Sequence, residues 1–202
     1  MRRTLWLAAI LLVMAVLAIE RRTTLIAKSA NPADGPQFSA DGKLLRPAGY
    51  RKWVFLSSGF GMSYSQNASD DPDHLMFTNV FVPPADYDYF LSHGRWPDKT
   101  MLVVEAYGSQ SKGSINLRGH FQTEFMGLDV EVKDASRFAD QWAYFAFDTT
   151  QPSAQAITPG KNGCWSCHDQ DAAVEHTFVQ FYPSLLAIAK EKNTLKPGVK
   201  LP

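Results

Sequence analysis

The chain is poor in cysteine and has no excess of charge of either sign. Two of its 202 residues are cysteine, and lysine plus arginine equal aspartate plus glutamate at 20 each. Two thiols are too few for a disulfide framework or a four-cysteine zinc site. A balanced charge gives no basic field to attract nucleic acid or an acidic membrane. We therefore expect neither as a partner, and the two thiols must serve some other purpose.

No apolar run is long enough to cross a bilayer comfortably. The run from Leu5 to Ile19 is shorter than the roughly 20 residues that a spanning helix needs. Arginines stand on both sides of it, a layout typical of a secretory signal. Small residues near its end favour cleavage, whereas the arginines that follow also suit an uncleaved anchor. We expect export to the periplasm, with residues 1–30 as a signal peptide or inner-membrane anchor and residues 31–40 as a spacer.

Residues 41–202 are predicted to form a single domain of the α+β class, mainly an antiparallel sheet with a few packed helices. Helices are expected at 84–94, at 134–141 with Asp134 as N-cap, and at 173–192 with a kink at Pro183. Short runs rich in β-branched and aromatic residues, separated by turn signals, predict strands at 52–60, 77–82, 100–107, 120–133 and 142–147.

Both cysteines lie in one pentapeptide, Cys164-Trp165-Ser166-Cys167-His168. A disulfide oxidoreductase would place this motif in a βαβ unit, which the sequence does not show. A structural zinc site would need four ligands, and His176 with His168 cannot replace a second cysteine pair. The remaining chemistry is attachment of haem c, with Cys164 and Cys167 as thioethers and His168 as the axial iron ligand. The sequence therefore predicts one covalent haem.

Beyond this motif, the chain from about 41 to 187 resembles the cytochrome P460 family, which includes the β-fold cytochromes c′. The resemblance implies a five-coordinate haem with His168 proximal, an open distal face, often a homodimer, and chemistry on small nitrogen species. That chemistry is hydroxylamine oxidation in one branch and reversible binding of nitric oxide or carbon monoxide in the other. The matching segments are "LLRPAGYRKWVFLSSG" (44–59), "FTNVFVPPADYDYFLSHGRWPDKTMLVVEAY" (77–107), "MGLDVEVKDASRFADQWAYFAF" (126–147) and "TFVQFYPSL" after the cysteines.

The chain departs from the family's enzymes at one position. In those enzymes a lysine just before a glutamate is joined to the porphyrin, and here Val104 precedes Glu105. The resemblance therefore implies no such cross-link, unless Lys99 or Lys112 reaches the ring from elsewhere. Asp129 is the candidate counterpart of the family's distal carboxylate, where it would act as acid or base.

Other side chains are candidates for the haem pocket. Phe77, Phe81 and Phe125 are predicted to cap the distal face, although each also suits ordinary core packing. Met101 or Met126 as a sixth iron ligand would give an electron-transfer cytochrome, although methionines more often fill gaps in cores.

The leading hypothesis is an exported monohaem cytochrome that binds or converts nitric oxide or related nitrogen oxides, with a periplasmic redox partner. Val104 favours this hypothesis. The alternatives are a hydroxylamine-oxidising enzyme, which Asp129 favours, and a six-coordinate electron carrier, which a methionine ligand would decide.

Overall fold

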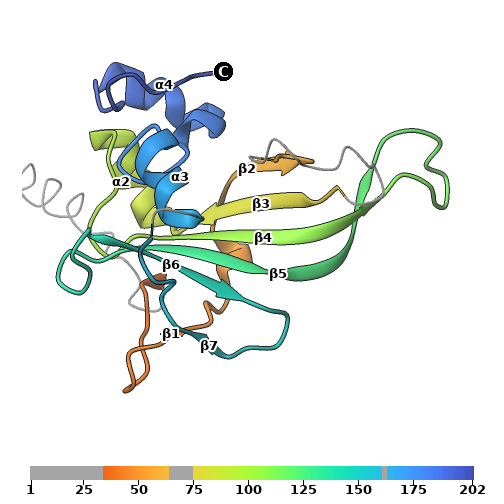
Figure 1. Cartoon of the computed structure of the whole chain (residues 1–202). Coiled ribbons are helices and arrows are strands. Elements are labelled where there is room, and N and C mark those ends of the chain that lie inside the picture. Colours follow the sequence, from red (N-terminus) through yellow and green to blue (C-terminus); the bar gives the residue numbers. More distant parts are fainter. Residues whose placement is uncertain (1–33, 64–74, 161–162) are drawn as a thin grey trace, which may run out of the picture. The chain divides into compact units, whose positions relative to one another are not determined.

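The main sheet is an antiparallel meander in which each strand pairs with its neighbour in the sequence (Figure 1). All five predicted strands are present, and the α+β prediction is confirmed. The strands, in sheet order, are β2 (Val54–Phe60), β3 (Phe77–Val82), β4 (Met101–Gln110), β5 (Phe121–Lys133) and β6 (Trp142–Phe147).

The computed structural model describes residues 34–63, 75–160 and 163–202. The predicted signal or anchor at 1–30 lies outside these residues. Within them, no helix combines the length and apolar character that crossing a membrane requires. Asn31–Pro202 is a compact unit. Phe38, inside the predicted spacer, packs against the core, so the folded part begins before residue 41.

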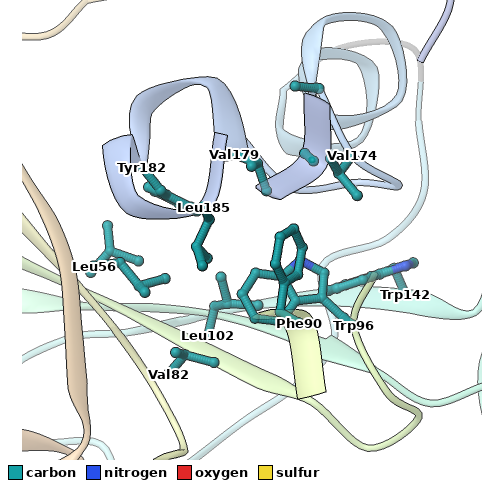
Figure 2. Packing of buried hydrophobic residues seen from close by; sticks show 13 residues of the cluster. Leu56, Val82, Phe90, Trp96, Leu102, Trp142, Val174, Val179, Tyr182 and Leu185 are labelled. Carbon is teal, nitrogen blue, oxygen red and sulfur yellow. The ribbon is translucent and has the colours of Figure 1, made fainter. Parts of the chain in front are cut away.

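Both faces of the sheet are buried. Successive side chains of a strand point to opposite faces, and a separate hydrophobic cluster lies on each face. The first face is covered by α2 (Pro84–His93) and α4 (Pro183–Glu191). Phe90 of α2 and Leu185 of α4 meet Leu102 of β4 there (Figure 2). The side chains of these two helices and of the strands beneath them form the hydrophobic core on that face.

The second face packs against β1 (Leu44–Leu45), β7 (Ser153–Ala154) and the short 3₁₀ helix η2 (Tyr50–Lys52). A buried polar group fixes η2 to β4. The Tyr50 hydroxyl donates to Glu105 Oε1 at 2.6 Å, and the Arg51 guanidinium pairs with the same oxygen at 2.6 Å. Glu105 is therefore hydrogen-bonded and ion-paired on the face of the sheet that turns away from the helices, where it has a structural role.

Two helix predictions fail, one wholly and one in part. Residues 134–141 form turns rather than a helix. The Asp134 carboxylate does accept from the backbone N–H of Ser136, as an N-cap would, but only a single turn follows, in which the Arg137 and Phe138 N–H groups donate to the Asp134 carbonyl. Residues 173–182 contain a turn and the 3₁₀ helix η4 (Val179–Phe181). Pro183 does not kink a long helix but stands in the first turn of α4, where its missing N–H costs nothing.

Helix α2 carries a buried acid. It begins at Pro84 and ends at His93, and the next residue, Gly94, caps it with a φ of 66° that suits glycine. Asp86 faces the interior, and burial raises its pKa to about 7 despite hydrogen bonds with Thr100 and the Met101 amide. In the folded protein this carboxyl group therefore holds its proton at pH values where the unfolded chain has released it.

We expect Asp86 to make stability fall as pH rises. Below its ordinary pKa of 3.8 the group is protonated in both states. Between that pH and about 7 only the unfolded chain loses the proton, so the free energy of unfolding falls by up to about 4 kcal/mol. Urea titrations of Asp86→Asn across this range should show a flatter pH dependence, whereas Asp88→Asn, on the exposed side of α2, should keep the original one. An unchanged slope in Asp86→Asn would contradict the assignment.

Candidate functional site

A cavity lies between the first face of the sheet and the segment that carries the two cysteines. The space measures about 880 Å³, including its opening to solvent. Its sheet wall includes Val104 of β4 and Asp129 and Glu131 of β5, and its other wall includes Cys164 and His168. The predicted haem-binding motif thus faces a space rather than packed core.

The motif forms the helix α3 (Cys164–Asp171). Gly163 precedes it with φ 88° and ψ −146°, a conformation that other residues avoid. The Trp165 indole donates to the Ile157 carbonyl at 3.0 Å and ties the helix to the segment that follows β6. Both thiols are free, with Cys164 exposed and Cys167 half-buried. The helix therefore holds two available sulfur atoms about one turn apart.

The His168 ring is held in one tautomer. Its Nδ1 lies 2.6 Å from the His176 carbonyl oxygen, which can only accept, so Nδ1 carries the proton and donates. Burial lowers the pKa of His168 to about 4, which keeps the ring neutral. Nε2 is therefore left with its lone pair, the form that binds a metal.

The carbonyl that accepts this bond belongs to a rigid turn. Thr177 donates to the Val174 carbonyl at 2.9 Å and accepts from the Trp96 indole at 2.8 Å. Glu175 stands between them with φ 52° and pairs with Lys133 at 2.8 Å. The helical core thereby fixes the position of the His176 carbonyl.

The C-terminal end of α3 is held by the tail of the chain. Lys196 Nζ donates to the carbonyl of Asp169 at 2.7 Å and to that of His168 at 3.2 Å. Gln180 Nε2 donates to the Asp171 carbonyl at 2.7 Å. These donors satisfy the carbonyls that a helix leaves unpaired at its end.

Two carboxylates occupy the opposite wall of the cavity. Glu131 Oε1 lies 3.8 Å from His168 Nε2, and its Oε2 is buried without a hydrogen-bond partner among the described residues. Burial, reinforced by Asp129, raises the pKa of Glu131 to about 8. Asp129 is reached by solvent through the open cavity, yet the surrounding protein still raises its pKa by desolvation.

The residues present fit the haem that the sequence predicts. A neutral His168 with a free Nε2, a thiol on the cavity wall at Cys164 and a second thiol on the same helix are the donors that haem c requires. The buried hydroxyl of Tyr144, which has no partner among the described residues, and Glu131 Oε2 also border this cavity. Unpaired polar atoms of this kind are expected where a site is completed by a bound group.

The structure brings some predicted residues together and separates others. Val104 and Asp129 are direct cross-strand partners and both line the cavity. Phe81 and Phe125 pack on the second face. Phe77, four residues before Phe81 on β3, points to the same side as Phe81 and contacts Phe60, with ring centroids 4.5 Å apart. The three phenylalanines are therefore not in the cavity wall, because strand parity turns them away from it.

The alternative lysines and methionines also lie elsewhere. Lys99 is bound to Asp134 and Ser136 before β4 begins. Lys112 stands eight residues beyond Val104, roughly 26 Å along an extended strand. Met101 is buried on the second face, and Met126 is exposed. None of the four lines the cavity.

Several lining residues were not predicted from the sequence. Glu131 could have been found from strand parity, because it stands two residues after Asp129, between Val130 and Val132. Tyr144, Phe178, Phe181 and Met62 carried no such signal. Their place in the cavity depends on how the loops and strands pack.

The comparison with known families gives one match. The model of the family described as cytochrome P460 matches residues 47–179, about two thirds of the chain. The matched range contains the whole main sheet and α3. No curated protein matches the chain.

Lys196 lies beyond the matched range, and we expect it to stabilise α3. Lys196→Met should lower the free energy of unfolding by about 1–2 kcal/mol, because the carbonyls of His168 and Asp169 lose a charged donor. Urea unfolding measures the change. Lys200→Met, at an exposed position in the same tail, is the control, and equal stabilities of the two variants would argue against this role.

Proposed function

This chain belongs to the cytochrome P460 family, whose cofactor is haem, and on that premise we propose that it is a monohaem c-type cytochrome that binds or converts nitric oxide or related nitrogen oxides. The observation that carries the proposal is the orientation of His168. Its Nε2 lone pair faces a cavity that also contains one of the two cysteines.

Three residues of α3 would hold the haem. The thiols of Cys164 and Cys167 would form the thioethers, and His168 would be the axial ligand. The backbone hydrogen bond from His168 Nδ1 to His176 fixes the ring's direction before any group binds. The haem would supply the iron to which a small diatomic or N–O ligand binds.

The wall opposite His168 decides which ligands are favoured. Val80 and Val104 make part of it apolar, which excludes water and suits small neutral gases. Valine at position 104 has no nucleophile with which to form a second link to the porphyrin. These features support binding of nitric oxide without the ring modification of the family's enzymes.

The carboxylate pair supports hydroxylamine oxidation as a second candidate. Asp129 and Glu131 lie on the same face of β5, two residues apart, and both border the cavity. A carboxylate there can accept a proton from a bound N–OH group, the proton transfer that this oxidation needs. The sequence suggested Asp129 for this role, and the structure adds Glu131, whose Oε1 lies 3.8 Å from His168 Nε2.

An electron-transfer role would require a different sixth ligand from those predicted. Met101 and Met126 do not line the cavity, whereas Met62 does. A low-spin resting spectrum that Met62→Ala abolishes would favour this role over gas binding.

Export to the periplasm, a redox partner there and a homodimer complete the proposal. They are supported by the N-terminal apolar run and by the resemblance to the family.

The first expected outcome is that haem remains with the polypeptide after treatment with acidified acetone, because thioethers survive denaturation. Replacing both Cys164 and Cys167 by alanine should release it into the solvent. His168→Ala should keep the haem but change the optical spectrum of the iron. Extraction of the pigment from the unmodified protein would overturn covalent attachment.

The second expected outcome separates gas binding from catalysis. Peptide mapping should find haem mass only on the fragment with Cys164 to His168. The ferrous protein should be mainly high-spin before a ligand is added, and it should then bind nitric oxide. Hydroxylamine oxidation should be slow or absent. Any residual turnover should fall about 100-fold or more in Glu131→Gln or Asp129→Asn, the effect of removing a general base, and remain in Glu124→Gln, an exposed position on β5. Haem mass on a fragment containing Lys99 or Lys112, or rapid turnover, would make the enzyme assignment the better one.

A further inference from the structure

The turn between β4 and β5 presents two aliphatic side chains to solvent. Ile115 is 94% exposed and Leu117 is 91% exposed, far more than any other large hydrophobic residue described. Figure 1 shows this connection, in green, at the end of the sheet away from the helices. Neither side chain contributes to either hydrophobic cluster. Their exposure is therefore not explained by the packing of the core.

The turn is held in shape by its own hydrogen bonds. Asn116 Nδ2 donates to the Ser111 carbonyl at 2.8 Å and to the Gly119 carbonyl at 3.2 Å, and its backbone N–H donates to the Gly113 carbonyl at 3.0 Å. The polar Asn116 side chain thus turns inward, while the aliphatic residue on each side of it faces out. This is the reverse of the usual burial pattern, and it gives the tip a small apolar surface with no partner in the core of the domain.

Cations flank the two aliphatic residues. Lys112 and Arg118 stand on either side, and residues 111–123 contain no aspartate or glutamate. Among the described residues, no carboxylate forms an ion pair with either cation. The net charge of the whole chain is balanced and gave no reason to expect a membrane surface as a partner. Residues 111–123 nevertheless carry a local excess of positive charge.

We propose that this hairpin tip, residues 111–120, docks on an anionic lipid bilayer. Ile115 and Leu117 enter the boundary between headgroups and acyl chains, and Lys112 and Arg118 lie at the level of the lipid phosphates. Apolar burial and attraction to anionic headgroups act together in such contacts. The charge complementarity of the tip decides in favour of lipid.

A second copy of the chain is a less suitable occupant. A standard protein interface buries about 800 Å² on each partner, much more than two side chains at the tip of a turn provide. A second copy would also have to place carboxylates opposite Lys112 and Arg118 within that small area. A bilayer meets both requirements, since its anionic headgroups surround an apolar interior.

The test uses the fragment 31–202, which removes the N-terminal apolar run. This fragment contains every described strand and helix and both core clusters, and it is a compact unit. It is sedimented with vesicles of phosphatidylglycerol and phosphatidylcholine in equal parts, and with vesicles of phosphatidylcholine alone. We expect binding to the anionic vesicles that weakens as salt is added. Haem absorbance in the same samples reports separately on the haem site.

Variants distinguish the two parts of the contact. Ile115→Ser with Leu117→Ser should lower the partition coefficient about tenfold or more, because the apolar burial is lost. Lys112→Ser with Arg118→Ser should lower it by a similar factor and remove the preference for phosphatidylglycerol. Leu45→Ser with Leu201→Ser, two exposed aliphatic residues elsewhere, should bind as the unchanged fragment does.

Three results would overturn the proposal. The first is equal binding of the unchanged fragment and the Ile115→Ser, Leu117→Ser variant. The second is binding that does not depend on the anionic lipid. The third is a dimer in sedimentation velocity that this variant converts to monomer while no fragment binds vesicles, which would identify a second copy as the occupant.

Discussion

The hydrogen bond from His168 Nδ1 to the His176 carbonyl is the interaction on which the site depends. It fixes the tautomer of the ring, directs Nε2 towards the cavity and joins α3 to the turn that follows it. That turn is positioned by the bond between Trp96 and Thr177, within the core under the helices. The chemistry of the motif is therefore tied to the packing of a tryptophan far away in the sequence.

Strand β5 shows how one segment serves both the core and the site. Val130 and Val132 pack on the second face, while Asp129 and Glu131 line the cavity on the first. A shift of one residue in register would exchange these sets and bury the carboxylates against β1 and β7. The core on the second face therefore fixes the register that places the carboxylates in the cavity. Such a shift in register would take Val130 and Val132 out of this core, and the free energy gained by burying them there would be lost.

The raised pKa values of Glu131 and Asp129 show a cost to the folded protein, since burial removes water from both carboxyl groups and the nearby Asp129 adds to the effect at Glu131. Such an arrangement is typical of functional sites rather than of structural ones. Glu105 contrasts with these two acids. Its carboxylate accepts a hydrogen bond from Tyr50 and pairs with Arg51 on the other face of the sheet.

The sequence by itself determined the five strands, the α+β class, the haem motif and the absence of a lysine at Val104, because strand periodicity and the C-x-x-C-H spacing are local properties. It also placed Asp129 on the correct strand. Only the tertiary structure decided which face each strand turns to the cavity. For that reason Phe81 and Phe125 lie away from the predicted haem pocket while Glu131 and Tyr144 border it. Both faces of the sheet are buried, so apolar residues occupy odd and even positions of a strand alike. The sequence pattern therefore cannot tell the two faces apart, and only the segments that pack on each face do so.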